Sequence, residues 1–210
     1  GAQIETPDDI GQIISIYVDY PLQKRHRMCL KNPAIASALD ALLAKLKPDV
    51  VHAHTIHTYL TYDALRVAAI HTNKVFMTAH DTFLVSFDRV NSERYRSDTR
   101  KHQPHKLTLW DHLSAVGRRY WPLRNNAIRS ALKDSKTTII SITKTLDDFL
   151  KANGIENTTV IHNGVKSYEL SDAETRSFRH AHQLTGPTLL YGGRINADKG
   201  VGVLLQAMKT

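Results

Sequence analysis

The sequence predicts an α/β fold built on a Rossmann-like parallel sheet with helices on both faces. Short runs rich in β-branched residues alternate along the chain with amphipathic segments of helical length. Such alternation produces right-handed βαβ units, and these units produce a parallel sheet. The 210 residues, of which 41% are hydrophobic, suffice for one sizeable core, or for one domain and part of a second.

The expected elements follow from this alternation in chain order. Pro33 begins a helix at a position that favours proline, Pro48 ends it, and Gly154 follows a later helix where a left-handed residue is favoured. The stretch 81–105 has no clear period, so we expect a long loop there. The expected strands are 13–18, 49–53, 74–78, 137–141, 158–161 and 188–191. The expected helices are 34–46, 59–70, 107–116, 121–132, 143–153, 173–182 and 200–208.

Composition excludes several classes of protein. No apolar run reaches the roughly 18 residues that a membrane span needs, and no secretory signal is visible. Cys29 is the only cysteine, so it cannot form an internal disulfide. A cytoplasmic protein is therefore the expectation.

The net charge of +8 arises in one segment. Between Arg89 and Lys136 there are 12 basic and 4 acidic residues, whereas the rest of the chain is balanced. A surplus confined to one segment predicts a surface that faces an anionic partner, such as nucleotide phosphates, lipid headgroups or nucleic acid. A solvated, variable insertion is the alternative interpretation.

Histidines occur at the end of the expected strand 49–53. His52, His54 and His57 lie where ligands bind in open parallel sheets, beyond the carboxyl ends of the strands. Imidazole can hydrogen-bond a substrate hydroxyl or phosphate, or bind a metal ion. Only Asp63 offers a further metal ligand nearby, so structural roles and a substrate contact by His54 are favoured over a metal site.

A second polar pair follows the expected strand 74–78. His80 is followed directly by Asp81. A histidine at such a turn can act as a base or bind a sugar hydroxyl, with the neighbouring carboxylate orienting the ring. A chance pairing of two polar residues is the alternative.

The segment 192–200 separates the last expected strand from the last expected helix. Gly192 and Gly193 allow the backbone to turn tightly and approach a ligand, and the helix N-terminus behind them favours anions. The planar guanidinium of Arg194 and the compact ammonium charge of Lys199 can both bind phosphate oxygens. The spacing matches neither the dinucleotide fingerprint nor the P-loop. The segment predicts a diphosphate site of another kind, with an ordinary surface turn as the alternative.

Together these motifs resemble glycosyltransferase family 4, whose members are retaining nucleotide-sugar transferases with the two-domain GT-B fold. Five segments occur in the family's order. They read PDVVHAH at 48–54, TAHD at 78–81, IS to NGI over 140–155, VIHNGV at 160–165, and LYGGRI with DKG over 190–200. His162 stands where the family usually has proline, which would make the hinge less rigid.

The resemblance implies a role for each matching residue. Arg194 and Lys199, with Gly193 beside them, would bind the donor diphosphate and stabilise it as the leaving group, so that neither a metal ion nor another cofactor is needed. His80 would lie near the transferred sugar as the catalytic candidate.

The resemblance also implies the partners, which are a nucleotide-sugar donor and a carbohydrate or lipid-linked acceptor. His54 and Asp81 would lie on the acceptor side. Because Trp110 and other aromatic residues accompany the basic segment Arg89–Lys136, a peripheral contact with the anionic inner face of the membrane is a hypothesis.

The resemblance further divides the chain. Residues 1–166 would form the acceptor-side domain without its first strand and Gly-rich loop, 167–186 a hinge, and 187–210 the start of the donor-binding domain. The family's pair of C-terminal glutamates would come later than residue 210. We therefore expect a piece of a glycosyltransferase that is inactive by itself.

Two other functions stay open. A nucleotide-sugar epimerase of the same two-domain build would share these segments. Nucleic-acid binding through the basic segment is less favoured, because no helix-turn-helix, zinc-finger or RRM signature occurs. We therefore expect no nucleic-acid partner.

Overall fold

A computed structural model describes residues 2–5, 12–20, 22–86, 90, 93–196 and 199–208. The chain divides into two compact units, Gly1–Asn163 and Gly164–Thr210. The strands of the first unit are β1 (Ala2–Glu5), β2 (Ile13–Ile16), β3 (Val51–His54), β4 (Val75–Ala79), β5 (Thr138–Ser141) and β6 (Thr158–Val160). Its helices are η1 (Leu22–Lys24), α1 (Arg25–Met28), α2 (Pro33–Leu46), α3 (Asp63–His71), α4 (Glu93–Arg100), α5 (Leu109–Val116), η2 (Gly117–Arg119), α6 (Leu123–Asp134) and α7 (Lys144–Ala152).

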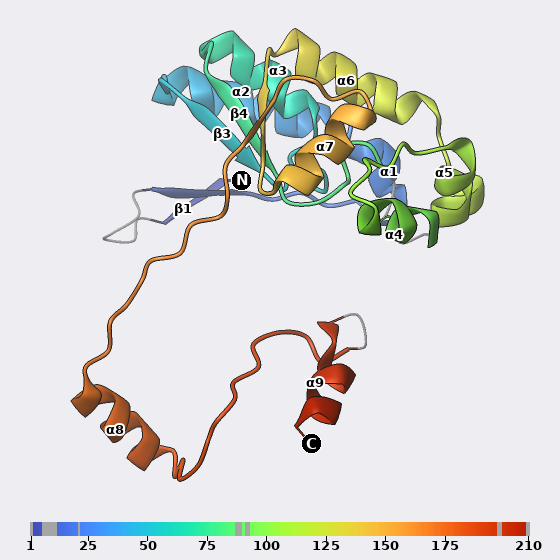
Figure 1. The fold of residues 1–210 in the computed structure, drawn as a ribbon. Coiled ribbons are helices and arrows are strands. Elements are labelled where there is room, and N and C mark those ends of the chain that lie inside the picture. Colours follow the sequence, from blue (N-terminus) through green and yellow to red (C-terminus); the bar gives the residue numbers. More distant parts are fainter. Residues whose placement is uncertain are drawn as a thin grey trace. The chain divides into compact units, whose positions relative to one another are not determined.

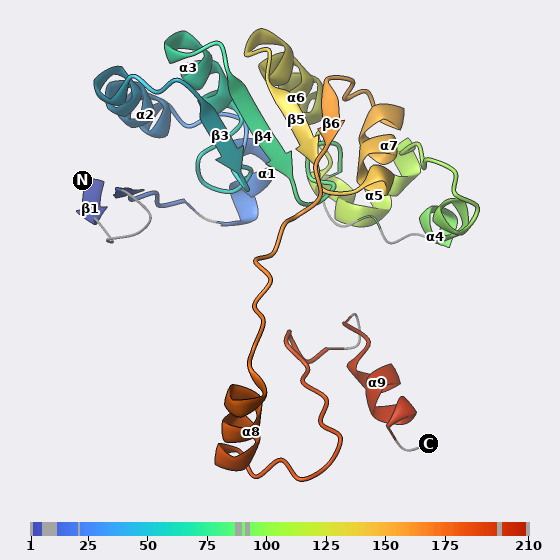
Figure 2. The same cartoon turned by 60° about the vertical axis from the view of Figure 1, so that its left-hand side comes forward.

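The centre of the first unit is a parallel sheet with the strand order β3-β4-β5-β6 (Figures 1 and 2). The register places His54 opposite Thr78, and Thr78 opposite Ile140. Each crossover passes through helical structure, as parallel strands require. The predicted α/β class with a Rossmann-like parallel sheet is therefore confirmed.

One face of the sheet is buried against helices. Met77, Ala79 and Ile139 point to this face and join a single apolar core with side chains of α3, α6 and α7. The other face carries His52, His54 and Thr159, which are exposed. Helices thus flank the sheet, and these three side chains lie exposed on the face opposite the core.

The expected strand 13–18 differs from the prediction. It is shortened to β2, which pairs antiparallel with β1 in a separate two-stranded sheet. Antiparallel strands can be joined by a short connection, whereas a parallel pairing needs a long crossover. A β-rich run therefore does not by itself determine which sheet it joins.

The predicted loop over 81–105 is wrong in part, because it contains α4. This helix is strongly polar, so it has no apolar period that could reveal it. Tyr95 attaches it to the core and lies edge-on to His105 and Phe149. His105 is buried and bonds Asp98 of α4 through Nδ1 at 2.7 Å.

The second unit contains α8 (Asp172–Ala181) and α9 (Val201–Ala207), close to the predicted helices. The predicted strand 188–191 is wrong, because these residues form no strand. Leu189 and Leu190 are exposed. A strand needs a partner for its backbone groups, and the described residues of this unit provide none.

Gly154 has the left-handed backbone that the sequence predicts, with φ of +83°. A Cβ there would lie 3.5 Å from Cδ of Arg129, which is ordinary contact. We predict that Gly154→Ala lowers the free energy of unfolding by about 1–2 kcal/mol, because L-residues are strained in this conformation. Gly164→Ala is the matched control, since it lacks a positive φ and has open space around it. Equal denaturant midpoints for the two variants would contradict the prediction.

Candidate functional site

The carboxyl ends of β3 and β4 meet at one edge of the sheet. His54 ends β3, and His80 directly follows β4. Because the strands are parallel neighbours, the two imidazoles come together, with Nδ1 of His54 3.1 Å from Nε2 of His80. Two histidines that are 26 positions apart in the sequence are thus in hydrogen-bond contact at the predicted edge.

His52 extends this pair into a row of three imidazoles. Its ring lies 4.2 Å from the ring of His54, and its Nε2 is 2.8 Å from Oγ1 of the buried Thr78. The bond to Thr78 agrees with the structural role considered for His52, although its ring is exposed rather than in the core.

The neighbouring imidazoles affect the charge of His54. Partial desolvation, and then the proximity of His52 and His80, lower the pKa of His54 from its ordinary value. The neutral ring is therefore favoured at pH 7. A neutral imidazole can both donate and accept a hydrogen bond, which suits contact with sugar hydroxyls.

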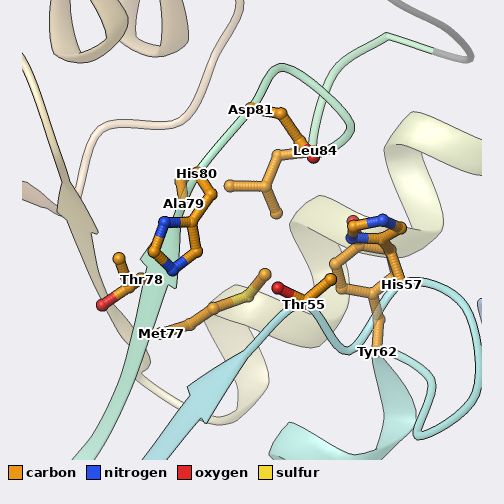
Figure 3. A pocket seen from close by; sticks show the side chains of 9 residues that line it. All are labelled: Thr55, His57, Tyr62, Met77, Thr78, Ala79, His80, Asp81 and Leu84. Atoms are coloured by element: carbon orange, nitrogen blue, oxygen red, sulfur yellow. The ribbon is translucent and has the colours of Figure 1, made fainter. Parts of the chain in front are cut away.

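A small pocket lies beside this row (Figure 3). His80 and His57 lie on opposite sides of it, with Leu84 and Met77 between them. The ring of His57 stacks on Phe83 with ring centres 4.6 Å apart. The residues that line the pocket come from the β3–α3 loop, from β4 and from the turn after β4: Thr55, His57, Tyr62, Met77, Thr78, Ala79, His80, Asp81 and Leu84.

Asp81 lines the pocket but also shapes the turn. Its Oδ1 accepts a hydrogen bond from the N–H of Phe83 at 2.9 Å. The carbonyl of Thr82 accepts from the N–H groups of Val85 and Ser86. One oxygen of the predicted acceptor-binding carboxylate therefore holds the turn that follows His80.

The start of α6 clamps the same turn, and sequence reasoning missed this contact. Arg124 is 2% exposed, and its Nη2 donates to the carbonyl of Phe83 at 2.6 Å. Asn125 donates from Nδ2 to the carbonyl of Val85 at 2.7 Å. By sequence Arg124 counts as one of the cations of the basic segment. Nothing in its local pattern shows that it is buried, because the carbonyl that it bonds lies 41 residues earlier.

The basic segment otherwise presents its charge at the surface. Arg89 lies outside the described residues. The exposed cations are Arg94, Arg96, Arg100, Lys101, Lys106, Arg118, Arg119, Lys133 and Lys136. On α5, Leu109 and Trp110 are also exposed, the latter at 77%. Cations and exposed apolar side chains thus occur in the same segment of the sequence.

The predicted diphosphate-binding residues lie in the second unit. Asn196 and Tyr191 both donate to the carbonyl of Arg194, which forms a compact turn. A Cβ on Gly193 would lie 3.0 Å from the Tyr191 hydroxyl, so the turn favours glycine there. Arg194 and Lys199 are both exposed. They belong to a different compact unit from His80.

Neither a metal-binding cluster nor a membrane-spanning helix occurs among the described residues. Within the described ranges, no group of three or more His, Cys, Asp or Glu side chains is placed to bind a metal ion. Among the helices of the same residues, none has both the length and the apolar character that crossing a bilayer requires.

Comparison with known proteins identifies one family. The family model described as Glycosyltransferase Family 4 matches residues 5–167, which is more than half of the chain. Comparisons with curated proteins and with solved structures found no match. The matched range contains His54, His80 and Asp81, but not Arg194 or Lys199.

The clamp on the turn can be tested with Arg124→Met. We expect it to lower the free energy of unfolding by about 1–3 kcal/mol, because the carbonyl of Phe83 loses the charged donor of a buried side chain. Amide hydrogen exchange at Val85 and Ser86 should also become faster. Arg119→Met is the matched control, since Arg119 is exposed in the same basic segment. If both variants unfold at the same denaturant concentration, Arg124 does not hold the turn.

Proposed function

Because the chain belongs to glycosyltransferase family 4, we propose that it forms the acceptor-side part of an enzyme that transfers a sugar from a nucleotide-sugar donor. The acceptor is a carbohydrate or a lipid-linked molecule, and the anomeric configuration is retained. The observation that carries the proposal is the meeting of His54 and His80 at the carboxyl edge of the sheet. This edge is where open parallel sheets bind their ligands.

In the proposed reaction the charge develops on the donor diphosphate. As the bond from the anomeric carbon to the phosphate oxygen breaks, its electron pair stays with the diphosphate. The acceptor hydroxyl oxygen forms the new bond to that carbon, and its proton leaves with the diphosphate. Arg194 and Lys199 would stabilise that negative charge, which removes the need for a metal ion. His80 would contact the transferred sugar, while His54 and Asp81 would face the acceptor. The exposure of the two cations leaves them free to approach phosphate oxygens.

The diphosphate site is tested by nucleotide-sugar binding to the 210-residue chain, measured by calorimetry across a panel of donors. The second unit forms no strand among its described residues, so we expect weak binding. Arg194→Gln should weaken it further by roughly 10- to 100-fold, because a charged hydrogen bond to phosphate is lost. The exposed Arg176 of α8 gives the control Arg176→Gln. Equal affinities for both variants, or no donor bound by the unaltered chain, would count against the proposed function.

We also propose that the basic segment rests on an anionic membrane surface. Exposed Trp110 and Leu109 of α5 would enter the headgroup region, and Arg118 and Arg119 would face the lipid phosphates. The apolar and basic groups are close in the sequence and both are exposed.

Vesicle sedimentation tests this contact. The chain should bind phosphatidylserine-containing vesicles more strongly than phosphatidylcholine vesicles, and Arg118→Glu should weaken binding by at least about fivefold, because each cation near such a surface contributes about 1 kcal/mol. Lys45→Glu in α2 has the same change of charge outside the basic segment and should have less effect. Equal binding to both kinds of vesicle would exclude the contact.

A further inference from the structure

A cavity lined by basic side chains lies where the C-terminal end of α7 meets α6 and the segment that leads into α5. Its volume is about 440 Å³, and small-molecule sites in proteins are typically of roughly 300–1,000 Å³. Lys106, Arg129 and Lys151 bring cations to it from three separate segments, and the described residues that line it include no aspartate or glutamate. This basic cavity shares no lining residue with the pocket beside the histidine row.

Arg129 of α6 is held in place by neutral groups. Its Nη1 donates to the carbonyl of Asn153 at 3.3 Å, and its Nη2 donates to Oδ1 of Asn126 at 2.6 Å. Within the described ranges of the chain, Arg129 forms no ion pair. Its guanidinium therefore keeps its full charge, and three of its five N–H groups are left for a ligand. Because the side chain is already oriented, binding a ligand costs less conformational entropy.

The side chain of Asn153 fixes the backbone on both sides of Lys106. Its Oδ1 accepts from the N–H of Leu107 at 2.9 Å, and its Nδ2 donates to the carbonyl of His105 at 2.9 Å. The Lys106 side chain is exposed, and its ammonium has neither an ion pair nor a hydrogen bond among the residues that the structure describes. Lys106 is thus anchored at the rim of the cavity with its charge uncompensated.

The basic cavity carries a surplus of positive charge that a phosphate group would match. Asp147 lies 2.9 Å from Nζ of Lys151 and compensates that cation. Lys106 and Arg129 remain, which leaves two uncompensated positive charges. A phosphate monoester carries about −1.5 to −2 charge at pH 7 and has three strong acceptor oxygens. A carboxylate or a phosphodiester carries a single negative charge and matches less well.

We propose that the basic cavity binds a phosphate monoester group. Arg129 and Lys106 donate to its oxygens, and the organic part of the ligand lies against lining residues such as Leu107 and Tyr120. Either a soluble sugar phosphate or the headgroup of phosphatidic acid carries such a group, and both present the same chemistry to the cavity. The site goes beyond the proposed sugar transfer and does not depend on it.

Nitrogen-15 NMR of the labelled 210-residue chain tests the site with glucose 6-phosphate as the probe. Titration should shift the amide signals of Leu107 and Asn153 saturably, whereas glucose should not shift them. Lys106→Gln should weaken binding by about tenfold and Arg129→Gln by roughly 10- to 100-fold, because charged hydrogen bonds to phosphate are lost. Lys101→Gln is the matched control, since Lys101 is exposed in the same basic segment but does not line the cavity.

Vesicles distinguish the two sources of the phosphate group. Phosphatidic acid has a monoester headgroup, whereas phosphatidylglycerol has a diester. If the ligand is a lipid, the chain should bind phosphatidic acid vesicles at least about fivefold more tightly than phosphatidylglycerol vesicles of equal mole fraction, and Lys106→Gln should remove this preference. Equal binding to both vesicles, together with saturable binding of glucose 6-phosphate, supports the site with a soluble ligand.

Four results would overturn the proposal. The first is the absence of both a saturable shift with glucose 6-phosphate and a preference for phosphatidic acid. The second is an equal loss of affinity in Lys101→Gln and Lys106→Gln, which would indicate a general effect of charge. Because Lys106 is exposed, its variant should fold even if Arg129→Gln does not. The third is an equal response to glucose. The fourth is a thymidine oligonucleotide that shifts the same signals at lower concentration, which would assign the cavity to nucleic acid.

Discussion

The parallel pairing of β3 with β4 is the constraint on which the site depends. It places His54 opposite Thr78, so the residue two positions later, His80, emerges beside His54. A shift of one residue in this register would turn His52 and His54 into the apolar core and break the row of imidazoles. The burial of Met77 and Ala79 on the helical face therefore fixes the position of the polar groups on the other face.

The parts of the fold that the sequence predicted are those with strong local patterns. The buried strands and the amphipathic helices α2 and α7 carry their own periodicity, and Gly154 marks a helix end by itself. The helix α4 could not be predicted, because one aromatic side chain attaches it to the core. The strand expected at 188–191 had a suitable pattern, but a strand also needs a neighbour, and local pattern contains no information about neighbours.

The same distinction applies to the candidate site. His54, His80 and Asp81 could be predicted from their positions at the ends of expected strands, because a parallel sheet brings the carboxyl ends of neighbouring strands together. It did not identify Arg124, whose role depends on a contact with the carbonyl of Phe83 across 41 positions. Nor could it show that Asp81 bonds the backbone of its own turn. Residues that hold the turn beside the site through backbone contacts have no sequence signal of their own.

Cys29 has a practical consequence for work on this protein. It is 2% exposed, and its carbonyl accepts a hydrogen bond from the N–H of Tyr62, a residue that lines the pocket. Because it is the single thiol in the chain, an alkylating reagent has one place to react and reaches it only when this part of the core opens. The rate of alkylation thus reports how often the core next to Tyr62 opens, and no label has to be engineered.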